Sequence, residues 1–190
     1  MINQPLTKPF RLSGKNIGVA VVDIQEKFRP AVPLFDTIAA TSAVLIRAFK
    51  TLSIPIIATE QYPKGLGRTV EPVASALGQT IKPLEKKSFS CCGASGFMEQ
   101  LERNTITTVC VCGIETHVCV YQTVLDLVEK GMNVVVVADA CGSRKALDHT
   151  TAIRRMEACG AVVMTVEMIL FDLLGSAENP AIKDVQRLVK

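Results

Sequence analysis

The segment Ile17-Gly-Val-Ala-Val-Val22 is continuously apolar, and an aspartate, Asp23, follows it directly. A short apolar run without alternation is typical of a strand that is buried on both faces, as in a parallel sheet. Parallel strands need long crossover connections, which are usually helices. The segment therefore predicts a parallel sheet whose strands are separated by helices.

The rest of the chain alternates short β-branched runs with longer segments whose apolar residues recur at helical spacing. We expect strands at residues 17–22, 54–59, 80–85, 106–112, 133–138 and 161–166. We expect helices at residues 34–52, 95–103, 117–130, 145–159, 168–174 and 180–189, with a shorter one opened by Pro72. This pattern predicts a three-layer α/β/α, Rossmann-like fold with a six-stranded, mostly parallel sheet.

Length and composition predict one folded domain over residues 1–190, because no linker, repeat or low-complexity tract interrupts the pattern. Apolar residues make up 48% of the chain and charged residues 21%, which excludes a disordered protein. The formal charge is only +3, and lysine and arginine form no run of five. Nucleic acid and membranes are therefore not expected partners.

The N-terminal residues 1–10 are polar, carry two prolines and contain no apolar signal region. The longest apolar runs in the chain are too short to span a bilayer. We therefore expect a cytoplasmic protein. Its many apolar positions are compatible with a homo-oligomer, which we also expect.

The chain has seven cysteines, an odd number, and a disulfide framework is not expected in this context. Cys110-x-Cys112 and Cys91-Cys92 resemble pieces of a metal site, but no second spaced pair accompanies them, and the chain has only two histidines. We expect no metal and no cofactor.

Candidate reactive residues follow three of the expected strands. Asp23 comes after the first strand, Lys86 and Lys87 after the third, and Cys119 near the start of the helix after the fourth. In open parallel sheets, ligands bind outside the carboxyl ends of the strands, where the strand order reverses. With the order 3-2-1-4-5-6, Asp23 and Cys119 would share one cleft, and a lysine would have to reach in from the third strand.

Cys119 has a physical reason to react. The helix N-terminus favours a thiolate, a lysine would lower the thiol pKa further, and an aspartate could accept the proton. A purely structural interpretation stays open for each residue. Cys119 could be a packed core thiol, Asp23 a turn cap and Lys86 a solvated surface charge.

Four segments resemble, in order, the motifs of isochorismatase-like cysteine hydrolases, with the isochorismatase-domain-containing branch most similar. The first three are Val21-Val-Asp23-Ile-Gln25-Glu-Lys-Phe28-Arg, Thr59-Glu-Gln-Tyr-Pro-Lys-Gly-Leu-Gly67 and Glu85-Lys-Lys-Ser-Phe89-Ser. The fourth is Cys112-Gly-Ile-Glu-Thr-His-Val-Cys119-Val. The resemblance runs from about residue 15 to residue 175. In the third motif a lysine stands three residues before an aromatic, which selects Lys86 over Lys87.

The resemblance implies the three-layer fold and a catalytic triad of Asp23, Lys86 and Cys119. It also implies a non-proline cis peptide, which falls at Ile114–Glu115. In the family this turn aims backbone N–H groups at a developing oxyanion, here those of Glu115 and Cys119.

Two departures from the family limit what the resemblance implies. The enzyme that gives the family its name cleaves a vinyl ether and lacks the nucleophilic cysteine, so Cys119 argues against that reaction. The nicotinamidase branch carries an Asp-x-His-x-x-His metal motif after the second strand. This chain has Glu60-Gln-Tyr-Pro at that point, without histidine, so a nicotinamidase metal site is not supported.

The leading hypothesis is therefore a hydrolase that attacks a small amide-like or related carbonyl substrate through a thioacyl-enzyme. The positions after strands nominate a substrate pocket of Phe28, Gln61, Tyr62, Phe89 and Ile114. One alternative is a redox or sensor protein in which Cys112 or Cys141 resolves an oxidised Cys119. Another is an interaction module with a vestigial site.

Overall fold

The computed structural model of the protein describes residues 10–189. Residues 1–9, on which the expectation of no secretory signal largely rests, lie outside the described part. Within it, six strands form one sheet in the order β3-β2-β1-β4-β5-β6, and every adjacent pair is parallel. The predicted fold class and strand order are confirmed.

The strands at the centre of the sheet are buried, as their sequences predict. β1 is buried along its whole length, and β4 is buried beyond its first residue. A sheet covered on both faces favours such continuous apolar runs. The strands are β1 (Ile17–Val22), β2 (Ile56–Gln61), β3 (Leu84–Lys86), β4 (Thr108–Ile114), β5 (Asn133–Gly142) and β6 (Val162–Met164).

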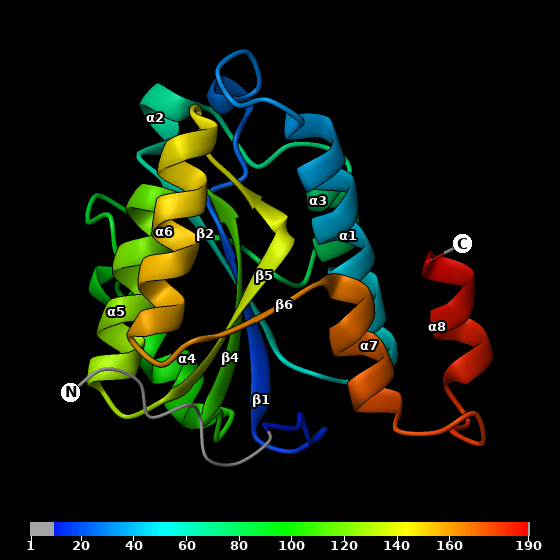
Figure 1. The fold of residues 1–190 in the computed structure, drawn as a ribbon. Helices are drawn as coiled ribbons and strands as arrows, with labels where there is room; N and C mark the ends of the chain where they lie inside the picture. Colours follow the sequence, from blue (N-terminus) through cyan, green and yellow to red (C-terminus); the bar gives the residue numbers. More distant parts are fainter. Residues whose placement is uncertain (1–9, 190) are drawn as a thin grey trace.

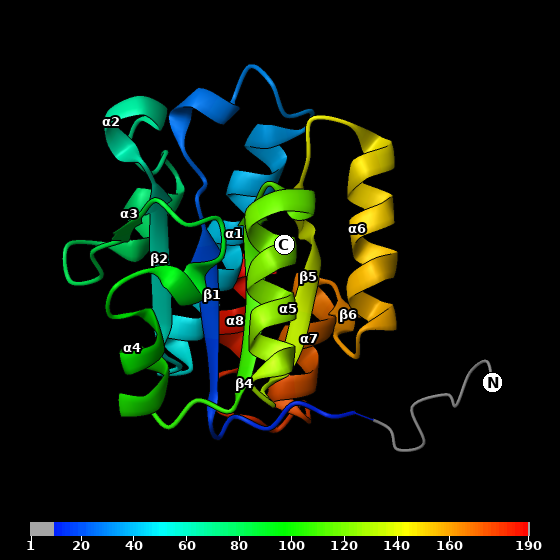
Figure 2. The same ribbon diagram turned by 90° about the vertical axis from the view of Figure 1, so that its left-hand side faces the viewer.

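Helices cover the two faces of the sheet, so that three layers result (Figures 1 and 2). One face carries α1 (Phe35–Thr51), α3 (Val73–Leu77) and α7 (Val166–Leu174), with α8 (Ile182–Val189) packed outside α1 and α7. The other face carries α4 (Phe97–Arg103), α5 (Tyr121–Glu129) and α6 (Ala146–Ala158).

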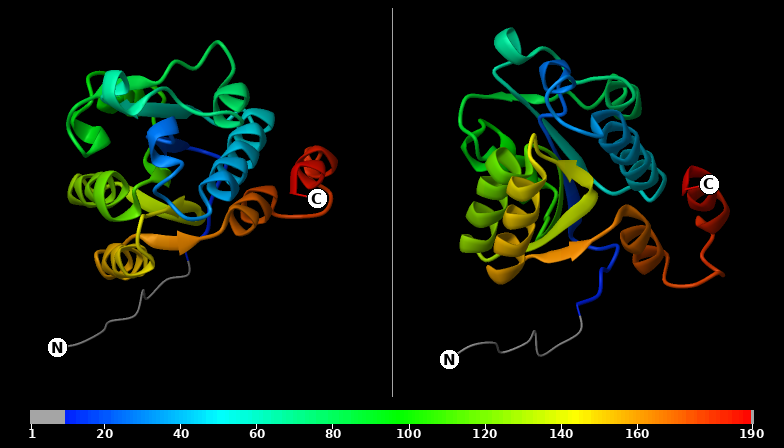
Figure 3. Two further views of the ribbon diagram at one scale, coloured as in Figure 1. Left: turned by 90° about the horizontal axis from the view of Figure 1, so that it is seen from above. Right: turned by 45° about the horizontal axis from the view of Figure 1, so that its top comes forward.

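Short turns and one small helix cluster at the carboxyl edge of the sheet, which the left panel of Figure 3 views from above. They are the 3-10 turns η1 (Glu26–Phe28) and η2 (Cys91–Gly93), the helix α2 (Pro63–Leu66) and the π turn η3 (Thr116–Val120). This is the edge at which an open parallel sheet offers a ligand site.

Several predicted bounds are wrong by a few residues. The second and fourth strands run two residues further than expected, to Gln61 and Ile114. The third strand covers only Leu84–Lys86, because Pro83 has no N–H to donate to a ladder and the strand begins after it. The helix expected at residues 117–130 opens as η3 before α5 begins. The helix expected at residues 95–103 begins at Phe97, with Gly96 at its N-cap position.

Within residues 10–189, no helix combines the length and apolarity that crossing a membrane requires.

Gly113 allows β4 to approach β1 at the end where Asp23 emerges. It has a φ of 130°, and a Cβ built on it would lie 2.0 Å from the carbonyl oxygen of Val22. Only glycine tolerates both the backbone conformation and this close approach. Gly131 also has a positive φ, of 77°, but nothing lies within 4 Å of a Cβ built there.

We therefore expect Gly113→Ala to lower the free energy of unfolding by more than ~3 kcal/mol. Gly131→Ala is the matched control and should cost about 1 kcal/mol, because it meets only the conformational penalty. Urea unfolding followed by circular dichroism measures both. Equal losses for the two variants would contradict the close approach of β4 to β1.

Candidate functional site

Asp23 and Lys86 meet in the interior at the carboxyl edge of the sheet. Asp23 follows β1 and has a φ of 50°, a left-handed conformation that aspartate adopts more readily than most residues. Lys86 is the last residue of β3, two strands away. Its Nζ lies 2.6 Å from Asp23 Oδ2, and neither side chain is exposed to solvent. The lysine therefore reaches past the end of β2 to form a buried ion pair.

The remaining polar atoms of this pair are also bonded. Lys86 Nζ donates to Gln61 Oε1 at 2.7 Å and to the carbonyl oxygens of Phe89 and Ser88 at 2.8 and 3.2 Å. Asp23 Oδ1 accepts a hydrogen bond from Thr59 Oγ1 at 2.8 Å. With four acceptors around three N–H groups, Lys86 has no donor left for another partner. Thr59 was not among the predicted site residues, and its bond to Asp23 spans 36 residues.

Cys119, which lies in the π turn η3, is the third candidate residue at this site. Its exposed fraction is 4%. Its thiol lies close enough to the Asp23 carboxylate for each group to affect the pKa of the other. Burial, and then the negative charge of Asp23, raise the pKa of the Cys119 thiol to about 12, while the charge of Lys86 opposes this. Lys86 lowers this pKa, as expected, but the net shift is upward and not toward a thiolate. Removal from water and the nearby carboxylate outweigh the effect of the lysine.

The pKa of Asp23 is also raised from its usual value, because the carboxyl group is buried. The charge of Lys86, and hydrogen bonds from Lys86, Thr59 and Cys119, act in the opposite direction. At rest, the site therefore holds the protonated thiol of Cys119 next to the carboxyl group of Asp23, which is best placed to accept its proton.

The chain between β4 and η3 brings Glu115 beside the nucleophile. The Ile114–Glu115 peptide bond is cis. The carbonyl oxygen of Glu115 accepts hydrogen bonds from the N–H groups of Val118 and Val120 at 3.0 and 3.2 Å. Its side chain, 6% exposed, accepts bonds from the backbone N and Nε of Arg144 at 3.1 and 2.9 Å. Glu115 thus ties η3 to the loop before α6.

Further hydrogen bonds hold η3 from its flanks. Thr123 Oγ1 donates to the carbonyl oxygen of Cys119 at 2.7 Å and accepts from the N–H of Cys91 at 2.9 Å. Thr116 Oγ1 lies 2.9 Å from His149 Nδ1. These contacts fix the turn that carries Cys119.

A cavity of about 520 Å³ opens beside Cys119. It includes three of the residues nominated for the substrate pocket, Phe28, Gln61 and Phe89, together with Lys27, Ala31, Leu66, Glu115, Val118 and Arg144. Two nominated residues do not line it. Ile114 is the last residue of β4 and is fully buried. Tyr62 has a φ of 37° and lines a neighbouring cavity with Lys64 and Lys87.

The two thiols considered as resolving partners of Cys119 lie on the α1 face of the sheet. Cys112 lies near Ser42 of α1, and Cys141 lines a cavity with Ile38 of the same helix. Cys119 instead begins the connection to α5 on the opposite face. This arrangement does not favour either pair.

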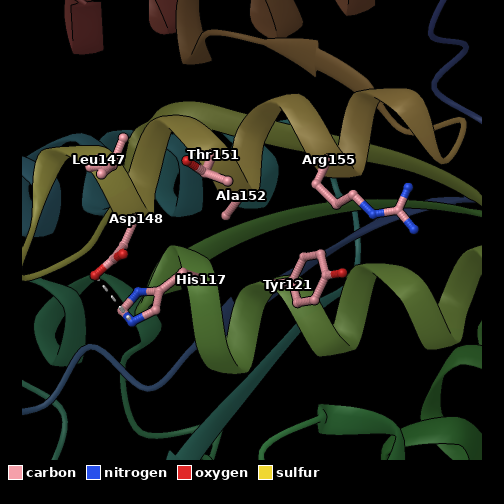
Figure 4. Close-up of a pocket in the computed structure, with 7 residues that line it drawn as sticks. All are labelled: His117, Tyr121, Leu147, Asp148, Thr151, Ala152 and Arg155. Carbon is pink, nitrogen blue, oxygen red and sulfur yellow. Dashed lines mark ion pairs between the residues drawn. The ribbon is translucent and has the colours of Figure 1, made fainter.

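A second groove, of about 360 Å³, lies between α5 and α6 and contains no member of the triad. Figure 4 shows side chains of the two helices facing one another across it. At one end, His117 Nε2 lies 3.9 Å from Asp148 Oδ2. Residues 10–189 contain no group of three or more histidine, cysteine or acidic side chains that could hold a metal ion.

The family model for the isochorismatase domain matches residues 19–168. The chain belongs to the isochorismatase family. The matched region includes Asp23, Lys86 and Cys119, and the resemblance inferred from the motifs is confirmed.

Relatives at substantial identity support this membership. Isochorismatase domain-containing protein 2A of Mus musculus is 39% identical over 169 residues, which are 88% of this chain and 80% of the relative. The solved structure of the MAR1 ribonuclease from Caenorhabditis elegans has a TM-score of 0.90 and 41% identity, covering 95% of this chain and 92% of that one.

A more distant structure shares the fold alone. The YcaC gene product of Escherichia coli, described as an octameric hydrolase of unknown specificity, has a TM-score of 0.85 at 24% identity and covers 96% of this chain and 97% of that one. The isochorismatase-family fold supports a hydrolase.

The high pKa of Cys119 has a measurable consequence. Because the thiol is protonated at neutral pH, we expect its alkylation by iodoacetamide to accelerate about tenfold per pH unit from pH 7 to pH 10, without a plateau. Asp23→Asn removes a charge that raises this pKa, so labelling at pH 8 should become about tenfold faster.

Mass spectrometry of the labelled peptides gives both rates, with the partly exposed Cys159 as a reference in the same spectra. A rate for Cys119 that levels off near pH 7 would show that the resting thiol is already ionised.

Proposed function

We propose that this protein is a cysteine-dependent hydrolase that cleaves a small amide-like or related carbonyl substrate through a thioacyl-enzyme. The observation that carries the proposal is the buried Asp23–Lys86 ion pair, which lies next to the Cys119 thiol beside a cavity. A nucleophile, a base within hydrogen-bond reach and a group that orients the base are the parts that nucleophilic catalysis requires.

The proposed reaction has two steps. Asp23 takes the proton of the Cys119 thiol as the sulfur attacks the carbonyl carbon, and then gives it to the departing amine or ammonia. A water molecule, deprotonated by the same carboxylate, next attacks the thioester, and the thiol is re-formed as the carboxylic acid leaves. Asp23 thus carries one proton in each direction, and no other reagent is needed.

Lys86 acts on Asp23 in this mechanism and does not contact the substrate. Four acceptors already surround its ammonium group. Its charge opposes protonation of the buried carboxyl, so Asp23 stays available as a base. The backbone N–H groups of Glu115 and Cys119 are the proposed donors to the oxyanion, because both residues line the cavity.

Ribonuclease activity is a second candidate, because the relative from C. elegans carries that name. The Cys119 site gives it less support than amide hydrolysis. Within residues 10–189, no group of acidic, histidine or cysteine side chains is arranged to hold a metal ion of the kind that many nucleases use. RNA cleavage is therefore assayed beside amide hydrolysis, with the same variants.

We expect Cys119→Ala and Asp23→Asn each to lower kcat/KM for a substrate amide by at least ~10³. Lys86→Met should also inactivate the enzyme, because it leaves the buried carboxylate unpaired. Cys159→Ala, which changes a thiol far along the chain at the end of α6, should retain activity. A panel of small carboxamides supplies the assay.

Direct detection of the intermediate makes the test sharper. Rapid quenching should give intact protein with the mass of one acyl group on Cys119, and hydroxylamine should remove it as a hydroxamate. Turnover that survives Cys119→Ala would contradict the proposal. RNA cleavage that depends on Cys119, without hydrolysis of any amide, would favour the ribonuclease.

The homo-oligomer stays a prediction. Large apolar side chains are exposed in the described part of the chain: Leu34, Tyr62, Phe89, Leu147, Met168 and Phe171. Two of them, Leu34 and Leu147, are 76% and 75% exposed. Light scattering after size-exclusion chromatography should give a mass that is a multiple of 20.5 kDa. A monomer at micromolar concentration would contradict it.

A further inference from the structure

The cavity beside Cys119 has a mostly apolar wall and a small number of charged groups. Phe28, Leu66, Phe89 and Val118 supply apolar surface. The charged residues that line it are Lys27, Arg144 and Glu115. A volume of about 520 Å³ is in the range of small-molecule sites, in which a few polar groups decide specificity.

The charges of the cavity do not cancel. Glu115 is paired with Arg144 at 2.9 Å, and in the layer beneath, Asp23 is paired with Lys86 at 2.6 Å. Lys27 forms no ion pair or side-chain hydrogen bond with any residue from 10 to 189, although its neighbour Glu26 is bonded to Arg29. One positive charge at the wall of the cavity is therefore unmatched.

The second cation of the cavity has unused donors as well. Arg144 meets Glu115 through its backbone N and its Nε. Its two terminal guanidinium nitrogens have no partner within residues 10–189, and the side chain is 58% exposed. Lys27 and Arg144 both line the cavity, and neither belongs to the proposed proton-transfer group.

We propose that the substrate carries a carboxylate, separated from its reacting amide by a short apolar body, and that Lys27 binds this carboxylate. The substrate class is thus the monoamide of a small aliphatic or aromatic dicarboxylic acid. The proposal rests on the proposed function, because it takes Cys119 as the attacking atom. The apolar body lies along Phe28 and Phe89, and the outer nitrogens of Arg144 provide the second contact of the carboxylate.

Lys27 is exposed, so water solvates its charge; a neutral amide would gain nothing from that charge, and a cationic one would be repelled by it. Glu115 does not offset this charge, because its carboxylate is already engaged by Arg144. A carboxylate is the complementary group, since ammonium and guanidinium donors form their strongest hydrogen bonds with ionised acceptors. Lys27 therefore determines specificity and is not required for the chemical step.

A pair of alkylating reagents tests this without knowledge of the natural substrate. Iodoacetate and iodoacetamide transfer similar groups to sulfur and differ in carrying a carboxylate or a neutral amide. The ratio of their rates at Cys119, measured by mass spectrometry at pH 8.5, reports the charge preference of the cavity. Because the pKa of the thiol affects both rates alike, it cancels from the ratio.

We expect Lys27→Met to lower the iodoacetate-to-iodoacetamide ratio about three- to fivefold, the size of effect typical of one partly exposed charge pair. Lys27→Arg should restore most of it. Lys64→Met is the matched control, because it removes the same charge from the neighbouring cavity, and should leave the ratio unchanged. An unchanged ratio in Lys27→Met, or an equal fall in Lys64→Met, would overturn the proposal.

A binding measurement keeps the proposal testable if Cys119 reacts with neither reagent, a result that counts against the proposed nucleophile alone. Benzoate and benzamide are titrated into Cys119→Ser with Lys27 intact and into the double variant with Lys27→Met. We expect benzoate to bind about three- to fivefold more weakly to the double variant, and benzamide to bind both equally. Equal benzoate affinity in the two proteins would overturn the carboxylate site.

Discussion

The site depends on a buried ion pair, that of Asp23 with Lys86. Moving two charged groups out of water costs several kcal/mol for each ion, and their attraction compensates only when the geometry is good and the remaining polar atoms are bonded. The pair meets both conditions, with 2.6 Å between the charged atoms and further bonds to Thr59, Gln61 and two backbone carbonyls. Removing either partner would leave an unpaired charge inside the protein.

The ion pair also requires that the end of β2 is held in place. β2 lies between the strands that supply the two partners. The side chain of Gln25 continues the hydrogen bonding beyond β1, accepting from the N–H of Gln61 at 2.7 Å and donating to its carbonyl oxygen at 3.0 Å. Gln61 in turn accepts a bond from Lys86 through Oε1. A chain of hydrogen bonds thus connects Gln25, in the first motif, through Gln61 to the ion pair.

The sequence predicts the sheet, and that Asp23, Lys86 and Cys119 lie together, better than it predicts the environment of these residues. Continuous apolar runs predict the strands, and the motifs nominate Asp23, Lys86 and Cys119 as site residues. Two strands end two residues later than expected, so Ile114 belongs to β4 and is buried. Thr59 and Arg144 act through contacts with partners 36 and 29 residues away, and local spacing carries no signal for them.

The pKa of the Cys119 thiol shifts in the direction opposite to the one expected, and the physical reason bears on the proposed mechanism. A helix end and a lysine favour a thiolate at an exposed position, but local sequence cannot report the burial that raises this pKa to about 12. The intrinsic nucleophilicity of a thiolate rises with the pKa of its thiol. In the proposed mechanism, a thiol that gives its proton to Asp23 during the attack therefore provides a sulfur of higher intrinsic nucleophilicity than a thiolate of low pKa would. The same carboxylate that raises the pKa would accept the proton as the new bond forms, so that no free thiolate has to exist beforehand.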